Sequence, residues 1–229
     1  MGLPAFDLYH VLDGVLSGRL PTALARQPII DLRTEAVAGH EVLFRIRGVP
    51  DVAPPILWEH AVRSGVLDRL EDHVARACRK QPRGPLPLFV NAHPSSEGIV
   101  ERWREIPNVV VELCEVAEIR QATVKELRNA RIPIALDDVG VGHADLRTLA
   151  RIIPQFIKAD RSLVESCDQS PGRSAVIKSL VCYTDAIGAT LIAEGVETRS
   201  EARRLMELGV RYAQGFLIGP PEIDWEAGA

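Results

Sequence analysis

The chain has 229 residues, of which 46% are hydrophobic and 25% are charged, and its formal net charge is −4. This balance excludes an intrinsically disordered chain, and the length suits one folded domain, which we expect to span residues 1–229. The small negative charge excludes a general attraction to DNA or to an anionic membrane, so any phosphate-binding site must be local.

Two further features indicate where the protein works. No uncharged apolar run is long enough to cross a bilayer, and the N-terminal segment MGLPAFDLYHVLDG lacks the basic start of a secretory signal. The four cysteines are far apart and form no metal-ligand spacing. Reduced thiols of this kind are typical of a cytoplasmic protein. Because no apolar run could span a bilayer, we do not expect a membrane as a partner.

Short apolar, β-branched runs bounded by turn residues follow one another along the chain. Runs of this length and character are typical of buried strands. The expected strands are 27–32, 40–46, 86–92, 109–115, 132–138, 156–160, 190–195 and 213–218.

Helical patterns lie between several of these strands. Apolar residues at steps of three and four recur after Leu67, after Leu146 up to Pro154, and after Val176 up to Gly188. Thr198 and Glu201 have the spacing of a capping box, which begins a helix whose apolar face includes Met206.

Strands that alternate with helices predict parallel βα units, and about eight of them suit a TIM-like (β/α)₈ barrel. A doubly wound open sheet is the alternative. Only residues 33–39 join the first two strands, too few for a crossover helix, so these strands should form an antiparallel hairpin. Few residues follow the last strand, so the final outer helix should be missing, and segment 8–24 could cover that side or the barrel floor.

Polar side chains stand at the ends of these strands, where hydrophobic strands usually give way to turn formers. Because the carboxyl ends of barrel strands meet at one face, these side chains should converge there. The set comprises Asn91, Glu112, Asp137, Asp138, Lys158, Glu194 and Gln214, together with Glu41 and Arg45, which lie on the second strand of the hairpin. Its carboxylates would repel one another unless a cation lay among them, and their oxygens suit Mg²⁺, Mn²⁺ or Ca²⁺.

Each of these residues also has a purely structural interpretation. Glu112 could pair with a buried Lys or Arg, and the two aspartates could cap the helix that follows them. Lys158 could be a structural lysine, and Glu194 could serve the next helix N-terminus, where negative charge is favoured. A metal site explains the whole set better, because adjacent carboxylates repel without a cation.

The ordered series of segments resembles the EAL domain of bacterial cyclic di-GMP phosphodiesterases. The segments are QPIIDL, HEVLFR, FVN, VELCE, IALDDVGVG, FIKADRS, IAEGVET and QGFLIGPP, and the likeness spans residues 27–221. HEVLFR stands where the family has its name-giving Glu-Ala-Leu. The resemblance implies a barrel that binds cyclic di-GMP and opens it to linear pGpG.

The resemblance also implies a role for each site residue. One divalent cation, Mg²⁺ or Mn²⁺, would be held by Glu41, Asn91, Glu112 and Asp137, with Asp138 and Glu194 assisting a second, and Ca²⁺ would inhibit. Lys158 would contact the attacking water, and Glu194 would act as general base or second-metal ligand. The substrate would be bound by Arg45 at a phosphate and by Gln27, Leu43 and Gln214, with Glu197 and Glu115 in support.

The loop after the aspartate pair departs from the family pattern. Active members show Asp-Asp-Phe-Gly-Thr-Gly-Tyr-Ser-Ser, whereas residues 137–145 are DDVGVGHAD, so the hydroxyl groups are gone. In the family this loop positions the second metal and couples dimerisation to activity. Glu115 loses its hydroxyl partner at Val141, and Gln155 replaces an aspartate before the lysine.

Two functions follow from this comparison. The retained ligand positions and Lys158 favour a phosphodiesterase, although the loop from Val139 to Asp145 predicts slow turnover. The changed loop favours the alternative, a receptor or interaction module that binds cyclic di-GMP and signals through a partner protein. A homodimer is expected by resemblance. An enolase-type barrel also sets carboxylates and lysines at strand ends, but the AEGVE and QGF segments do not support it.

Overall fold

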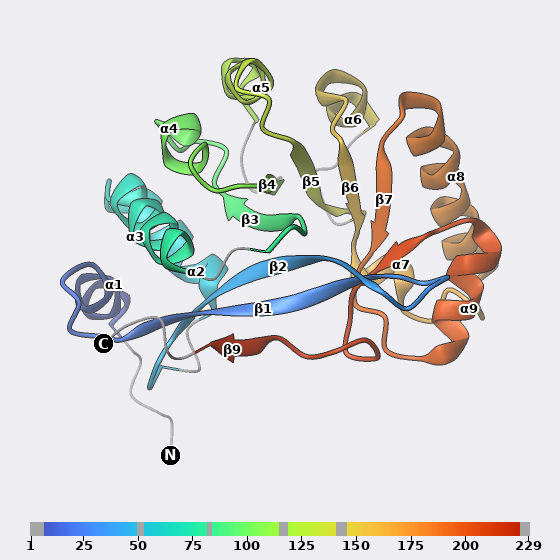
Figure 1. The fold of residues 1–229 in the computed structure, drawn as a ribbon, viewed down its shortest axis with the longest axis horizontal. Coiled ribbons are helices and arrows are strands. Elements are labelled where there is room, and N and C mark those ends of the chain that lie inside the picture. Colours follow the sequence, from blue (N-terminus) through green and yellow to red (C-terminus); the bar gives the residue numbers. More distant parts are fainter. Residues whose placement is uncertain (1–6, 50–52, 82–83, 115–118, 141–145, 225–229) are drawn as a thin grey trace.

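The computed structural model describes residues 7–49, 53–81, 84–114, 119–140 and 146–224. Eight strands form a closed barrel, and helices pack around its outside (Figure 1). The strands are β1 (Thr22–Asp31), β2 (Val37–Ile46), β3 (Leu88–Ala92), β4 (Val109–Cys114), β5 (Ile134–Val139), β6 (Phe156–Ala159), β7 (Thr190–Ala193) and β8 (Tyr212–Ala213), with β9 (Glu222–Asp224) outside the ring.

The predicted barrel and hairpin are confirmed. β1 pairs antiparallel with β2, and Gln27 lies opposite Glu41 in that register. Neighbouring strands from β2 to β8 are parallel. β1 also pairs antiparallel with β8, which closes the ring and rules out an open doubly wound sheet.

The helices of the described residues include the four that the sequence predicts. They are α1 (Leu8–Leu16), α2 (Pro54–Arg63), α3 (Leu67–Lys80), α4 (Ile99–Trp103), α5 (Gln121–Asn129), α6 (Leu146–Ile152), α7 (Arg161–Val164), α8 (Pro171–Ile187) and α9 (Arg199–Leu208). The predicted apolar stripes are wrong at Ile153 and Val176, which are 47% and 45% exposed, because α6 ends before Ile153 and the buried face of α8 carries Ile177, Leu180 and Val181. The helix α9 has the predicted capping box, with the Thr198 hydroxyl accepting from the Glu201 backbone and the Glu201 carboxylate accepting from the Thr198 backbone. Met206 is 41% exposed, so its predicted place on the buried face of α9 is wrong, because that face is covered at Leu205 and Leu208.

The end of the barrel differs from the prediction. The expected strand 213–218 is a two-residue strand, β8, followed by a turn in which the Ile218 and Gly219 amides donate to the Gly215 carbonyl. The backbone of Gly215 has φ 153°, and a Cβ there would lie 2.2 Å from the Val196 nitrogen. Only glycine, which has no Cβ, fits this close approach to Val196 at the turn that follows β8. The chain then returns along β1 as β9.

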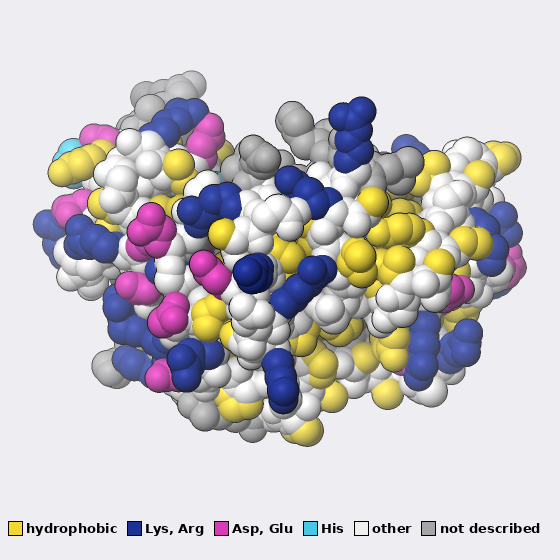
Figure 2. Space-filling model, turned by 90° about the horizontal axis from the view of Figure 1, so that it is seen from above, with side chains coloured by type: hydrophobic (Ala, Val, Ile, Leu, Met, Phe, Trp, Pro, Cys, Tyr) yellow, Lys and Arg dark blue, Asp and Glu magenta, His cyan; other side chains and the backbone are white. Residues whose placement is uncertain are grey.

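The surface agrees with the small net charge. Basic and acidic side chains lie side by side in the left half of the face seen in Figure 2, and hydrophobic side chains gather right of its centre. The predicted N-terminal covering segment begins with α1, which packs against α2 and α3. Within the described residues, no helix combines the length and the apolar character that crossing a bilayer requires.

Candidate active site

The alternation of side chains along the strands brings the polar residues together inside the barrel. A small apolar cluster fills the barrel interior and contains Ile29, Phe89, Val110, Ala135 and Ile192, with Phe156 and Tyr212 packed against it. Six of these apolar residues are each followed, two positions later in the chain, by a polar residue. The pairs are Phe89 and Asn91, Val110 and Glu112, Ala135 and Asp137, Phe156 and Lys158, Ile192 and Glu194, and Tyr212 and Gln214. Because strand side chains repeat with a period of two, this polar layer lies on the same inner face, above the apolar one.

The ammonium group of Lys158 lies at the centre of this layer. Its Nζ atom is 2.7 Å from Glu194 Oε1, 2.8 Å from Glu112 Oε1, 3.0 Å from Asp137 Oδ1 and 3.2 Å from Glu41 Oε2. The lysine side chain is 1% exposed and that of Glu112 is fully buried. Glu112 is therefore a partner for a buried lysine, as its structural interpretation expected. The same lysine also contacts the carboxylates of Glu41 on β2, Asp137 on β5 and Glu194 after β7.

The charged groups in this layer shift one another's pKa values. Desolvation, together with the neighbouring carboxylates, raises the pKa values of Glu112 and Glu194 well above the ordinary range of a glutamate, against the pull of Lys158. Desolvation lowers the pKa of Lys158, but the surrounding carboxylates outweigh it and raise that pKa well above the usual value for a lysine. The surrounding carboxylates therefore favour the protonated form of Lys158.

Two amides tie the carboxylates to one another. Asn91 Nδ2 donates to Glu41 Oε1 at 3.3 Å. Gln214 Nε2 donates to Glu41 Oε2 at 2.6 Å and to Glu194 Oε1 at 2.9 Å. Glu194 thus contacts Lys158 and Gln214, whereas Thr198 and Glu201 cap the helix that follows it. The alternative interpretation, in which Glu194 only stabilises the N-terminus of the next helix, is therefore not supported.

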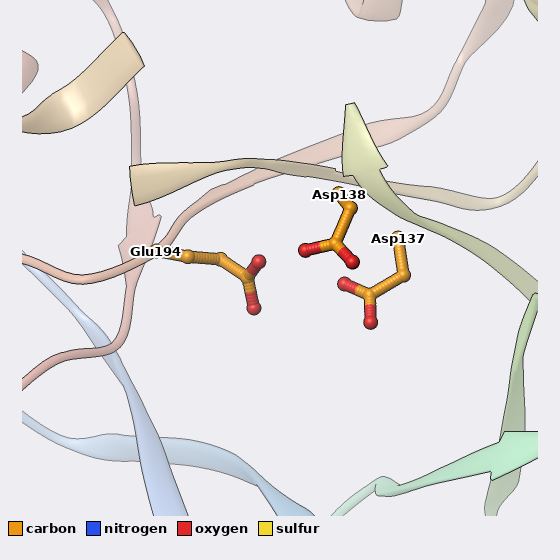
Figure 3. A group of neighbouring side chains, drawn as sticks. All are labelled: Asp137, Asp138 and Glu194. Carbon is orange, nitrogen blue, oxygen red and sulfur yellow. The ribbon is translucent and has the colours of Figure 1, made fainter. Parts of the chain in front are cut away.

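A group of three carboxylates lies at the ends of β5 and β7. One oxygen from each of Asp137, Asp138 and Glu194 lies within 4.8 Å of the others, and Figure 3 shows the three carboxylates pointing toward a common space. Asp138 adopts a left-handed backbone conformation with φ 55°. Desolvation of its carboxyl group and the charge of Asp137 raise the pKa of Asp138 to about 6.

The donor set fits a divalent cation. Glu112 Oε2 is buried and accepts no hydrogen bond within the described structure, and Asp137 Oδ1 contacts only the Lys158 ammonium. One ammonium leaves most of the surrounding negative charge uncompensated. Carboxylate and amide oxygens are the ligands that Mg²⁺, Mn²⁺ and Ca²⁺ prefer, so these residues suit such an ion.

A pocket of about 270 Å³ adjoins this polar layer. It is lined by the four residues that the sequence assigns to the substrate, which are Gln27, Leu43, Arg45 and Gln214, and by Glu197. Gly195 and Gly215 also line it, as do three side chains that the sequence did not single out, those of Arg161, Phe216 and Pro221. Their only signal was their place inside FIKADRS and QGFLIGPP. A smaller hollow near His40 and Leu88, where the strands begin, contains none of the site carboxylates.

Part of the predicted site cannot be described. Glu115 and residues 141–145 of the departing loop lie outside the described residues. Val139 and Gly140, at the start of that loop, are described, and Val139 is buried in the core.

The comparison with known families decides the classification. A family model described as "EAL domain" matches residues 21–221. The chain belongs to the EAL domain family. The cyclic di-GMP phosphodiesterase RocR of Pseudomonas aeruginosa is 33% identical over 219 residues, which cover 85% of this chain and 56% of RocR. This EAL chain spans little more than half of RocR and less than half of the next three curated relatives.

Solved structures agree with the family. The manganese and cyclic di-GMP complex of BlrP1 from Klebsiella pneumoniae is 28% identical, with a TM-score of 0.77 over 89% of this EAL chain and 56% of that chain. PaMucR phosphodiesterase in complex with c-di-GMP has a TM-score of 0.81 at 24% identity, over 95% of this chain and 98% of that one, and shows the fold alone.

Proposed function

We propose that the chain is a metal-dependent phosphodiesterase that hydrolyses cyclic di-GMP to linear pGpG. The observation that carries the proposal is the buried Lys158 ammonium among four carboxylates, next to a pocket lined by Arg45. Phosphodiester hydrolysis needs an activated water and positive charge near the phosphoryl oxygens, and this arrangement can supply both. The names of RocR and of the BlrP1 complex support this substrate.

The proposed metal ligands are Glu41, Asn91, Glu112 and Asp137, with Asp138 and Glu194 beside them. A divalent cation held there would neutralise charge on the phosphoryl oxygens and make a water molecule more acidic. Mg²⁺ or Mn²⁺ is the proposed working ion. Ca²⁺ is proposed to permit binding but to inhibit turnover, because its looser coordination geometry positions a water less strictly.

Lys158 and Glu194 have separate proposed roles in the reaction. Lys158 stays protonated because four carboxylates surround it, so it acts as a positive hydrogen-bond donor to the attacking water or to the phosphate. Glu194 lies 2.7 Å from the Lys158 ammonium and beside Asp137 and Asp138, a position that suits a carboxylate accepting a proton from a water held among these groups. Gln214 holds Glu194 and Glu41 in place through its side-chain amide.

The pocket provides the proposed substrate contacts. Arg45, which is half-buried and donates through Nη1 to the Phe44 carbonyl at 2.9 Å, would pair with a phosphate. Gln27 is held at the pocket by its 3.2 Å hydrogen bond to the Gly219 carbonyl, and Leu43 contributes apolar surface. Glu197 is proposed to support the floor, and Glu115 to anchor the departing loop.

The altered loop sequence favours a second candidate, a cyclic di-GMP receptor that signals through a protein partner. The phosphodiesterase and the receptor share the pocket and differ in turnover.

We further propose a homodimer, a cytoplasmic location in keeping with the four free cysteines, and a single barrel domain over residues 1–229.

Purified protein incubated with cyclic di-GMP and Mg²⁺ or Mn²⁺, and followed for pGpG by chromatography, tests the proposal. Metal-dependent pGpG that is lost in Glu41→Ala supports the phosphodiesterase. Binding in Ca²⁺ without product in any metal supports the receptor. Turnover by Glu41→Ala equal to that of the wild type would refute the metal assignment.

A further inference from the structure

A buried carboxylate from outside the barrel holds the chain where it leaves β3. Glu71, on α3, is 1% exposed, and its Oε1 atom accepts a hydrogen bond from the His93 amide at 2.6 Å. His93 directly follows β3 and lies two residues beyond Asn91, a proposed metal ligand. Glu71 is not among the site residues described above, yet it contacts the backbone that carries one of them.

The strand pairing around Asn91 is one-sided, which gives this contact its importance. The described pairing of β3 with β2 ends at Val90, whereas the pairing with β4 continues to Ala92. Asn91 therefore lies in the stretch that is paired on the β4 side alone. Because the next amide along the chain, that of His93, donates to Glu71, the carboxylate extends the fixation of the backbone beyond the last strand pair.

The side chain of Asn91 is itself held weakly. Its Nδ2 atom donates to Glu41 Oε1 at 3.3 Å, which is longer than the usual range of about 2.7–3.2 Å for such a bond. The Asn91 Oδ1 atom is the one that suits a cation. Its position therefore depends on the backbone of β3 more than on the contact with Glu41.

A charged network fixes the Glu71 carboxylate in turn. The Arg102 guanidinium, on α4, is 4% exposed, and its Nη1 atom donates to Glu71 Oε2 at 3.0 Å. Its Nε atom donates to Asp72 at 2.8 Å, and the Ser96 hydroxyl donates to Glu71. The helices α3 and α4 pack against each other outside the barrel (Figure 1). The carboxylate thus has a fixed place between two helices and the turn that follows β3.

We propose that Glu71 is a positioning residue for the metal site. Its hydrogen bond to the His93 amide fixes the end of β3, and with it the Asn91 amide oxygen, where a divalent cation would bind. Arg102 supports this role by holding the Glu71 carboxylate. The inference rests on the proposed function, because it takes Asn91 as a metal ligand.

The test measures the affinity of the nucleotide-free protein for Mn²⁺ alone, by titration calorimetry. The first variant, Glu71→Met with Arg102→Met, removes both charges of the buried pair, so neither is left without its partner. The second is Asn91→Ala, and the third combines all three substitutions. The control, Glu59→Met with Arg63→Met, removes an exposed ion pair of α2 that does not line the pocket. Thermal unfolding establishes that each variant is folded.

We expect the Glu71 and Arg102 double variant to bind Mn²⁺ about 10- to 100-fold more weakly, the usual effect of removing a group that orients a metal ligand. In the Asn91→Ala background the same two substitutions should cause little further loss, because the network acts through Asn91. Glu71→Gln with Arg102→Met keeps an acceptor for the His93 amide and should recover most of the affinity. The control should bind Mn²⁺ as the wild type does.

Two results would overturn the inference and leave the proposed function standing. One is a double variant that binds Mn²⁺ as tightly as the wild type. The other is an equal loss of affinity with and without Asn91, which would give the network a general structural role.

A double variant that does not fold moves the test to hydrogen exchange in the wild type. The His93 amide should then exchange as slowly as the amides of β3, and exchange at the rate of an exposed amide overturns the inference. A folded wild type that neither binds Mn²⁺ nor forms pGpG from cyclic di-GMP is a separate result, which overturns the proposed function and the inference with it.

Discussion

Gln214 donates its side-chain amide to Glu41 at 2.6 Å, although 173 residues separate them in the chain. The contact forms because β1 joins β2 to β8 and so closes the barrel, which brings the strand that carries Glu41 near the end of β8. The same amide donates to Glu194 at 2.9 Å. One residue thus connects a proposed metal ligand with the proposed base.

Replacing Gln214 with Ala should lower turnover more than it lowers substrate affinity. The substitution removes both hydrogen bonds and frees the two carboxylates to move apart. We expect kcat to fall by at least about tenfold, which corresponds to about 1.4 kcal/mol. Steady-state kinetics of Gln214→Ala beside the exposed-site control Gln121→Ala measures this effect, and a change confined to KM would contradict it.

Replacing Lys158 with Met should destabilise the metal-free protein by about 3–5 kcal/mol, because it leaves buried carboxylates without their cation. The loss should be smaller at low pH, where the carboxylates of Glu112 and Glu194, whose pKa values are raised, take up protons. Urea unfolding in EDTA at pH 5 and pH 8 measures this. A loss that is the same at both pH values would show that uncompensated charge is not the cause.

Asp138 should make the metal-free protein less stable as the pH rises. The pKa of Asp138 is raised to about 6, so the folded state holds this proton more tightly than the unfolded chain does. The resulting stabilisation is complete below the unfolded pKa of about 4 and is lost as the pH rises through about 6. Between pH 4 and pH 7, the wild type should therefore lose stability relative to Asp138→Asn in EDTA. A difference in unfolding free energy between the two proteins that stays constant across this pH range would refute the raised pKa of Asp138.

A second charged network should matter for folding. Arg102, which is 4% exposed, lies 3.0 Å from the buried Glu71 and also contacts Asp68 and Asp72 at 3.3 and 2.8 Å. Arg102→Met leaves the Glu71 carboxylate without its partner and should cost about 3–5 kcal/mol.

The double variant Arg102→Met, Glu71→Met removes both charges and should recover much of that loss. Urea unfolding of the two variants beside the wild type gives the comparison. A double variant no more stable than Arg102→Met would indicate that the hydrogen bonds from the His93 amide and the Ser96 hydroxyl to Glu71 are the larger contribution.

Much of this protein can be predicted from the sequence because local patterns carry the information. The apolar runs, the short link at residues 33–39 and the capping box at Thr198 predict the barrel, its hairpin and the start of α9, since periodicity and turn length depend on neighbouring residues only. The polar residues at the strand ends also predict which face of the barrel carries the site.

Only the tertiary structure decides what those side chains contact. The sequence does not show that one ammonium, Lys158, lies within 3.2 Å of four carboxylates, or that Gln214 reaches Glu41, because these distances depend on closure of the ring. It also does not show that Gly215 approaches the backbone of Val196 closely just after β8, since this is a contact between two loops. The pairing of Arg161 with Glu197 at the pocket has a similar origin, because the start of α7 after β6 meets the loop after β7.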